Sequence, residues 1–304
     1  MWSIWDRPQQ FREKRAVNSR YRRYCLLRED QSPQGVNILK IGIIGYGAMA
    51  QSLCRLLEAH APQIQVVKVL IRSGSKAQTK PLPLGAEFAF TTEALLAAQL
   101  DMVVECAGHA ALKQVGPAVL KSGVDLLIAS VGAMADAPTE QVLIDSALQS
   151  GAKLRIPAGA VGGLDVLGAG KLAGIDSVIY SSRKHPNAWK GTPAEKLVDL
   201  EHLTEPMTFF VGNARHAAVT FPQNANVAAV VALGSIGLDR TQVTLTADPS
   251  ATGNTHGIHA KGNFGEVTLT IIGKTLADNP RTSMLAPLSL VRSLMNLEQT
   301  VVIG

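Results

Sequence analysis

The chain is organised around residues 40–50, which read Lys-Ile-Gly-Ile-Ile-Gly-Tyr-Gly-Ala-Met-Ala. The apolar run Lys40–Ile44 predicts a short buried strand, and the apolar periodicity that follows predicts a helix through Ala59. Gly45 permits a tight turn between them, and Gly47 has no Cβ to keep a ligand away from the backbone. The N–H groups of the first helical turn would face that ligand, which is the geometry of a dinucleotide pyrophosphate site.

A glycine turn of this kind is also common in ordinary loops, so its context decides its meaning. A second predicted strand, Gln65–Ile71, completes a βαβ unit about 20 residues further on, and small Ala50 lets the helix pack closely on the first strand. The sequence therefore predicts a dinucleotide-binding turn made of Gly45, Tyr46, Gly47, Ala48 and Met49.

The end of the second predicted strand bears on the choice of cofactor. An NAD site usually has an Asp or Glu there to bind the ribose 2′-hydroxyl, but residues 70–73 read Leu-Ile-Arg-Ser. Arg72, followed by Ser73, would pair with a 2′-phosphate; the alternative is that Arg72 is a solvated loop residue. We expect NAD or NADP as the cofactor.

The composition is that of a compact α/β protein. The 304 residues are 46% apolar, 17% charged and 5% aromatic, which excludes a disordered or fibrous chain and disfavours an all-β sandwich. The 3 cysteines are odd in number and lack metal-ligand spacing, so we expect no disulfide framework, no metal site and a reducing cytoplasm. With neither a transmembrane stretch nor a signal peptide, no membrane partner is expected.

The net positive charge is concentrated at the start of the chain. Residues 1–38 contain eight Arg or Lys and four Asp or Glu, which accounts for +4 of the total of +5. The remainder is nearly neutral, so we expect no nucleic-acid partner. We interpret residues 1–38 as a disordered extension or the product of an upstream start codon; the alternative is a nucleic-acid arm through Arg20, Arg22 and Arg23.

From Leu39 onward, predicted strands and helices alternate. Helices are predicted at Thr92–Gln99, Leu112–Ser122 and Gln141–Ser150, and strands at Met102–Glu105, Asp125–Ala129 and Lys153–Ile156. This alternation predicts a Rossmann-type doubly wound parallel sheet. These strands run into small glycine-containing turns, including Cys106-Ala107-Gly108, at the carboxyl edge where such sheets bind ligands.

The pattern changes after Leu164. Strands are predicted at Ser177–Ser182, Thr208–Gly212, Gln242–Thr246, Gly257–Lys261 and Glu266–Ile271, with a hairpin turn at residues 261–265 and one clear helix at Ala225–Gly237. This predicts an α+β domain with a largely antiparallel sheet. A helix at Arg281–Asn296 and a strand at Thr300–Ile303 are predicted to return to the first domain.

The predicted elements define a domain organisation. We expect a dinucleotide-binding domain of residues 39–163 plus about 280–304, and a substrate-binding, catalytic and dimerisation domain of residues 164–279. An exposed face of the antiparallel sheet would suit a symmetric homodimer.

Six segments spread over residues 39–304 resemble the L-aspartate dehydrogenase family. They are Gly45–Ala50, Glu105–Gly108, Ser130–Ala133, Pro157–Asp165, Phe221–Ala229 and Asn254–Ile258. The resemblance implies NAD(P)-dependent oxidation of L-aspartate to iminoaspartate, then oxaloacetate and ammonia, or the reverse amination. It also implies that Ala160 and Asn226 contact the nicotinamide side of the cofactor and that His256 is the active-site histidine. Residues before Leu39 have no counterpart in this resemblance.

The chemistry needs a proton-transfer group and cations for two carboxylates. Histidine suits proton transfer near neutral pH. His256 and His259 lie three positions apart on a predicted strand and should point to opposite faces, so we expect His256 in the crevice, with His259 as the alternate. Lys184 is expected to bind a substrate carboxylate; otherwise it is a solvated strand end.

Some assignments have alternatives. The alternative to a cofactor contact for Asn226 is the N-cap of its helix, although Asn224 is the better cap candidate. For the function of the whole chain, the alternatives are a homoserine dehydrogenase-like or dihydrodipicolinate reductase-like enzyme, or a protein that senses NADP without turnover.

The role of Arg72 is testable by comparing cofactors. If Arg72 binds a 2′-phosphate, Arg72→Ala lowers kcat/KM with NADP far more than with NAD. The measurement is the ratio of the two efficiencies in wild type and variant; an unchanged ratio removes Arg72 from cofactor selection.

Overall fold

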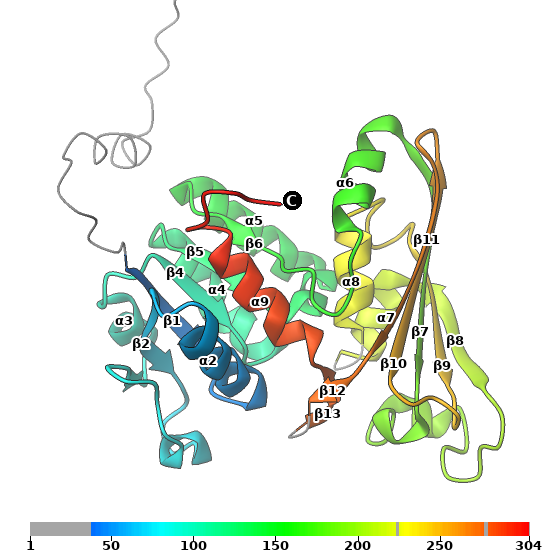
Figure 1. The fold of residues 1–304 in the computed structure, drawn as a ribbon, viewed down its shortest axis with the longest axis horizontal. Coiled ribbons are helices and arrows are strands. Elements are labelled where there is room, and N and C mark those ends of the chain that lie inside the picture. The colour runs from blue at the N-terminus through cyan, green and yellow to red at the C-terminus, as the bar shows by residue number, and fades with distance from the viewer. Residues whose placement is uncertain (1–37, 223–224, 277–278, 304) are drawn as a thin grey trace, which may run out of the picture. The chain divides into compact units, whose positions relative to one another are not determined.

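The computed structural model describes residues 38–222, 225–276 and 279–303, without the side chains of residues 279–281. The predicted extension, except for Ile38, and the cap candidate Asn224 therefore lie outside the described residues. Residues 38–304 form one compact unit (Figure 1). Among the described residues, no helix is long and apolar enough to cross a membrane.

A six-stranded parallel sheet forms the first half of this unit. Its strand order is β3 (Glu87–Ala89), β2 (Ile64–Leu70), β1 (Leu39–Ile44), β4 (Met102–Glu105), β5 (Asp125–Ile128) and β6 (Leu154–Arg155). The connecting helices are α2 (Ala48–His60), α3 (Thr92–Leu96), α4 (His109–Lys121) and α5 (Ala137–Ser150), with a 3-10 helix, η2, at Val131–Ala135. The order reverses between β1 and β4, where doubly wound sheets bind dinucleotides. The predicted Rossmann-type sheet is confirmed.

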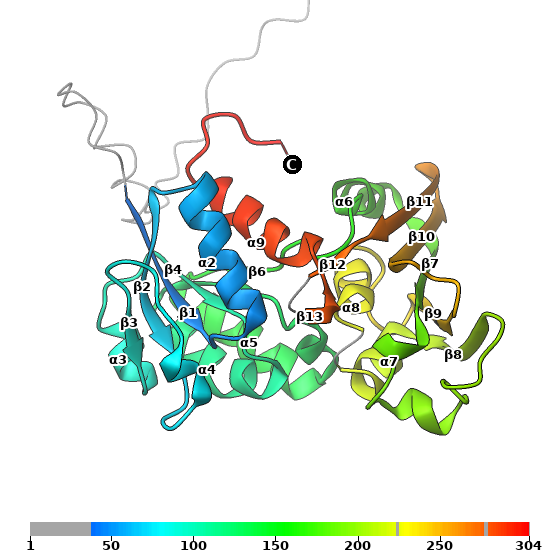
Figure 2. The same cartoon turned by 60° about the horizontal axis from the view of Figure 1, so that its bottom comes forward.

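The chain returns to this sheet through its last helix, as predicted. Helix α9 (Leu285–Met295) runs beside α2 in both views (Figures 1 and 2). Fully buried Leu290 and Leu294 of α9 pack in one apolar cluster with Leu53 and Leu57 of α2. Burying such side chains stabilises the fold by about 1.5–3 kcal/mol each, so the C-terminal segment is part of the first core.

A five-stranded sheet forms the second half. Its order is β11 (Gly265–Gly273), β10 (Asn254–Gly262), β7 (Ile175–Lys184), β9 (Gln242–Ala247) and β8 (Met207–Asn213). Only β7 and β9 pair in parallel; the other neighbours are antiparallel, as predicted. The predicted hairpin joins β10 to β11 through Asn263 and Phe264.

Three helices accompany this second sheet. They are α6 (Leu164–Ala173), α7 (Ala214–Thr220) and α8 (Asn226–Leu233). One apolar cluster includes Val131 of η2, Ala229 of α8 and Tyr180 of β7. The two sheets therefore share a core rather than being joined only by linkers.

The structure differs from the sequence prediction at several elements. Helix α6 is absent from the sequence prediction, and it contains Gly168 and Gly170, which lower helix propensity. A Cβ on Gly170 would lie 2.9 Å from the Phe264 ring, so the close packing of α6 on this ring requires glycine. Helix α7 was also missed, although Asn213 provides its N-cap by accepting a hydrogen bond from the His216 N–H at 2.8 Å.

Two predictions near the C-terminus are wrong. Residues 281–283 belong to a short strand, β13 (Asn279–Ser283), which pairs with β12 (Thr275–Leu276), so the last helix starts later than expected. The predicted strand Thr300–Ile303 is not a strand: it pairs with no strand of the six-stranded sheet, and its apolar side chains are exposed.

Helix α3 is shorter than predicted. It ends at Leu96 instead of Gln99, and Gln99 adopts a left-handed φ of 51° before β4.

Candidate active site

The glycine turn after β1 lines a large pocket. Its volume is about 860 Å³, and Gly45, Tyr46, Gly47 and Arg72 are among the residues that line it. Cys106 and Ala107, from the loop after β4, also line it. The turn predicted to bind a dinucleotide therefore opens into a pocket of nucleotide size.

The backbone of this turn fits a pyrophosphate. Gly45 has φ of +86°, and a Cβ there would lie 2.8 Å from the Cα of Ala107, so only glycine is accommodated. A Cβ on Gly47 would meet nothing within 4 Å and would extend into open space beside the helix start. No side chain caps α2, which leaves its first-turn N–H groups available to an anion.

The other predicted cofactor residues occupy different positions around this turn. Arg72 is exposed at the pocket edge, as a 2′-phosphate contact would require, and Ser73 is exposed beside it but does not line the pocket. Ala48 is half-buried in the first turn of α2, while Met49 lines a second pocket. Gly108 adopts φ of +109° as the N-cap of α4.

Buried Glu105 organises the loops around the turn, a role that sequence reasoning missed. Its carboxylate accepts hydrogen bonds from the N–H groups of Ala107 at 2.6 Å, Gly108 at 2.8 Å and Ser130 at 3.0 Å, and from the Ser130 hydroxyl at 3.0 Å. Burial raises the pKa of Glu105, and these four donors oppose that shift. Its only signal in the sequence is a carboxylate at the end of an apolar strand.

A second, smaller pocket of about 120 Å³ lies where the two sheets meet. Met49 and Ala160 line it from the first half, and Lys184, Asn226 and His256 line it from the second. The glycine turn before α2 lines the large pocket, and Met49 of α2 lines the small one. A dinucleotide bound at this helix start can therefore reach both pockets. The structure thus brings together five residues that were predicted from distant segments.

Strand pairing places His256 in this pocket. His256 lies opposite Ser182 in the antiparallel pair of β10 and β7, so Tyr180 and Lys184, two residues either side of Ser182, are its diagonal neighbours on the same face. The Tyr180 hydroxyl is 2.7 Å from Nδ1 of His256. Nε2 of His256 is buried and has no hydrogen-bond partner among the described residues.

Lys184 is a buried cation at the same site. Its residue is only 5% exposed, and its Nζ lies 5.1 Å from the centre of the Trp189 ring. It forms no ion pair with any carboxylate among the described residues. A buried charge without a counter-ion is costly unless a ligand supplies one.

Burial shifts the pKa values of these groups. Burial, reinforced by the positive charge of Lys184, lowers the pKa of His256 to about 3. Burial alone lowers the pKa of Lys184 to about 8. Burial raises the pKa of Tyr180, opposed by a hydrogen bond with Ser182, so the phenol stays protonated. At neutral pH the pocket therefore holds a neutral imidazole beside a cationic lysine.

Two alternatives from the sequence analysis differ from what the structure shows. His259 lies on the other face of β10 and forms an ion pair with Glu266 at 3.1 Å, so it does not line the pocket. Asn226 is the first residue of α8, preceded by Ala225 at the N-cap position, so it is not the cap. Within the described residues, no group of three or more His, Cys, Asp or Glu side chains could hold a metal ion.

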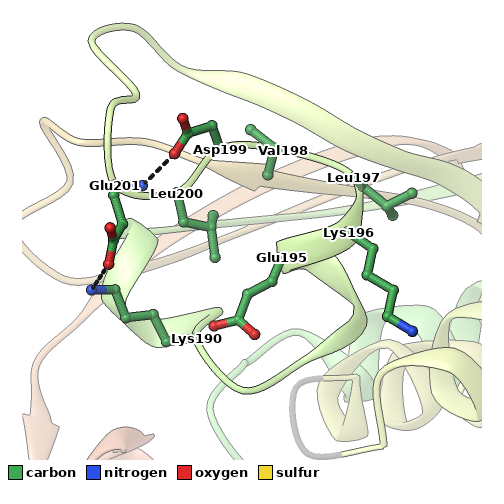
Figure 3. Close-up of a pocket in the computed structure, with 8 residues that line it drawn as sticks. All are labelled: Lys190, Glu195, Lys196, Leu197, Val198, Asp199, Leu200 and Glu201. Carbon is green, nitrogen blue, oxygen red and sulfur yellow. Dashed lines mark hydrogen bonds and ion pairs between the residues drawn. The ribbon is translucent and has the colours of Figure 1, made fainter.

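A third hollow, of about 550 Å³, lies over the loop that contains residues 190–201 (Figure 3). Its lining mixes Lys190, which pairs with Glu201 at 3.5 Å, with Glu195, Lys196 and Asp199. None of the predicted site residues lies there. This hollow is an open surface between charges of both signs.

Comparison with known proteins agrees with this geometry. Residues 165–297 match the family model described as aspartate dehydrogenase, C-terminal, and residues 45–157 match the homoserine dehydrogenase NAD binding domain. L-aspartate dehydrogenase of Ralstonia pickettii is 41% identical over 266 residues, which span 87% of this chain and 99% of that protein. The protein of that name from Brucella anthropi is 41% identical over 263 residues, 86% of this chain and 98% of the relative.

A solved structure is also similar. The crystal structure of aspartate dehydrogenase from Thermotoga maritima has a TM-score of 0.69 and 27% sequence identity, and the match covers 88% of this chain and 99% of that one. A doubly wound sheet with a glycine turn, joined to a second sheet over a shared pocket, is the architecture of a nicotinamide-dependent oxidoreductase. Within that class, the chain belongs to the L-aspartate dehydrogenase family.

The neutral state of His256 predicts a pH dependence of stability. Between pH 6.5 and about 3 the unfolded chain binds a proton at this residue that the folded protein does not bind. Its contribution to stability is therefore complete above pH 6.5 and is lost as the pH falls toward 3, with a slope of up to about 1.4 kcal/mol per pH unit.

Thermal unfolding of His256→Gln should accordingly depend less on pH between 6.5 and 4 than that of wild type. His60→Gln, at the exposed end of α2, is the matched control and should retain the wild-type slope. Equal slopes in wild type and His256→Gln would show that the imidazole is not held neutral.

Proposed function

We propose that this protein catalyses the NAD(P)-dependent oxidative deamination of L-aspartate to iminoaspartate, which gives oxaloacetate and ammonia, and the reverse amination. The observation that carries the proposal is the pairing of Lys184 and His256 in a buried pocket beside the start of α2. Family membership and the match of residues 165–297 to the aspartate dehydrogenase model support the same substrate.

The residues around the two pockets divide the work of binding the cofactor. The turn from Gly45 to Met49 holds the pyrophosphate, and Ala160 and Asn226 hold the nicotinamide end. The bound nicotinamide supplies the hydride acceptor for the Cα hydrogen of aspartate. Arg72 at the pocket edge is compatible with NADP, and residues 70–73 after β2 contain no Asp or Glu of the kind that an NAD site usually has there.

Lys184 binds a carboxylate of the substrate. Aspartate brings two carboxylates into a pocket where this cation has no ion-pair partner among the described residues, so binding satisfies a charge that the protein itself leaves unpaired. Homoserine has one carboxylate, whereas aspartate and dihydrodipicolinate each have two, so Lys184 alone does not separate aspartate from that cyclic imine. The match of residues 165–297 to the aspartate dehydrogenase model favours aspartate over the alternatives.

His256 transfers the proton. The tautomer that donates Nδ1–H to the Tyr180 oxygen leaves Nε2 as an acceptor facing the pocket. Binding of a substrate carboxylate offsets the Lys184 charge and raises the pKa of His256 toward the range useful for a general base. His256 then takes a proton from the substrate ammonium group or from the water that attacks iminoaspartate.

The predicted homodimer stays a prediction. The second sheet exposes apolar side chains at Ile179, Val211 and Ile272, which a symmetric partner would cover.

The direct test is NAD(P)H formation with L-aspartate at alkaline pH, in wild type and in His256→Ala. Loss of the proton-transfer group should lower kcat by about 10²–10⁴. His259→Ala, on the opposite face of the same strand, should stay within a few-fold of wild type. Equal activity of His256→Ala and His259→Ala would exclude the proposed role, and no turnover of aspartate by wild type would exclude the function.

If Lys184 binds a substrate carboxylate, its substitution should change KM for aspartate far more than KM for the cofactor. Lys184→Met keeps an unbranched apolar side chain but removes the charge that faces Trp189, and should raise KM for aspartate about 10- to 100-fold, as expected for a lost charge-assisted hydrogen bond. KM for the cofactor should change less than about two-fold, and exposed Lys261→Met should change neither. Equal increases in both constants would contradict carboxylate binding.

A further inference from the structure

Three segments that are far apart in the sequence meet beside the small pocket. His109 is the first residue of α4, Gly132 lies in η2, and Asn226 is the first residue of α8. Oδ1 of Asn226 accepts a hydrogen bond from the Gly132 N–H at 2.9 Å and lies 3.3 Å from Nε2 of His109. The contact joins the loop after β5 and the start of α4 to the helix of the second half.

These contacts fix which way the Asn226 amide points. A backbone N–H can only donate, so the atom facing Gly132 must be the side-chain oxygen and not the NH2 group. The same oxygen then receives the His109 ring N–H, which requires the tautomer with the proton on Nε2. With both acceptor positions of the oxygen used, the side chain offers the pocket its NH2 group.

The arrangement leaves little room for change. A Cβ on Gly132 would lie 2.8 Å from Oδ1 of Asn226 and 3.0 Å from the His109 ring, so a larger residue would displace both partners. Asn226 is not used as a helix cap, since Ala225 holds that position. Among the described residues, the hydrogen-bond partners of its side chain are Gly132 and His109 of the first half.

We propose that His109 is a positioning residue which, together with Gly132, holds the Asn226 amide so that its NH2 group donates a hydrogen bond into the pocket. The inference rests on the proposed function for the acceptor, which is the carboxamide oxygen of the nicotinamide. A donor fixed in this way contributes to binding of the nicotinamide end of the cofactor. Binding of the ADP-ribose end does not depend on this donor.

Calorimetric titration tests this without turnover. His109→Leu removes the ring donor, and His109→Gln replaces it with an amide N–H donor of similar reach. The probes are NADH or NADPH, whichever wild type binds more tightly, and the matching ADP-ribose or 2′-phospho-ADP-ribose. His109→Leu should weaken binding of the dinucleotide about 3- to 10-fold, the effect of one hydrogen bond, and His109→Gln should restore it.

Binding of the ADP-ribose probe should stay within about two-fold in both variants. A general loss of structure would weaken both probes and would not distinguish Leu from Gln. Equal dinucleotide affinity in His109→Leu, His109→Gln and wild type would overturn the positioning role alone. Failure of wild type to bind either dinucleotide would overturn the proposed function instead.

Asn226→Asp decides the question even if His109→Leu does not fold. The carboxylate keeps an acceptor for Gly132 and His109 but replaces the NH2 donor with an acceptor. Dinucleotide binding should weaken at least about 10-fold with the ADP-ribose probe unaffected. Unchanged dinucleotide affinity would show that no donor from Asn226 is needed.

Discussion

The antiparallel register between β7 and β10 is the constraint on which the site depends. Because His256 pairs with Ser182, the alternate residues Tyr180 and Lys184 share its face and lie diagonally beside it. A shift of one residue would turn the imidazole to the opposite face, where His259 pairs with Glu266. The hydroxyl contact at Nδ1, the lack of a partner for Nε2 among the described residues and the neighbouring cation all follow from this one register.

Burying the charge of Lys184 costs free energy, and no carboxylate among the described residues forms an ion pair that would offset this cost. Burial lowers the pKa of its ammonium group to about 8, and the remaining charge lowers the pKa of His256 further than burial would alone. A bound anion would raise the pKa values of both groups. In the proposed function, this effect would link substrate binding to the proton affinity of the imidazole.

The site exists only where the two sheets meet, and the contacts that join them are specific. Buried Glu105 holds the loops after β4 and β5 through four hydrogen bonds, and Gly132, two residues beyond Ser130, bonds to Asn226 of the second half. The shared apolar cluster supports this junction. The glycine turn after β1 and the pocket residues Lys184 and His256 are therefore held by one continuous structure.

The sequence by itself determined the parallel sheet, the glycine turn and the mainly antiparallel second sheet, because local periodicity and backbone freedom at Gly45 decide them. It also suggested His256 and Lys184, through resemblance and position on a strand. Tertiary structure alone decided the late start of α9, the absence of a strand at residues 300–303 and the partners Tyr180, Glu105 and His109. These features depend on pairing between segments remote in the chain, which local sequence patterns do not encode.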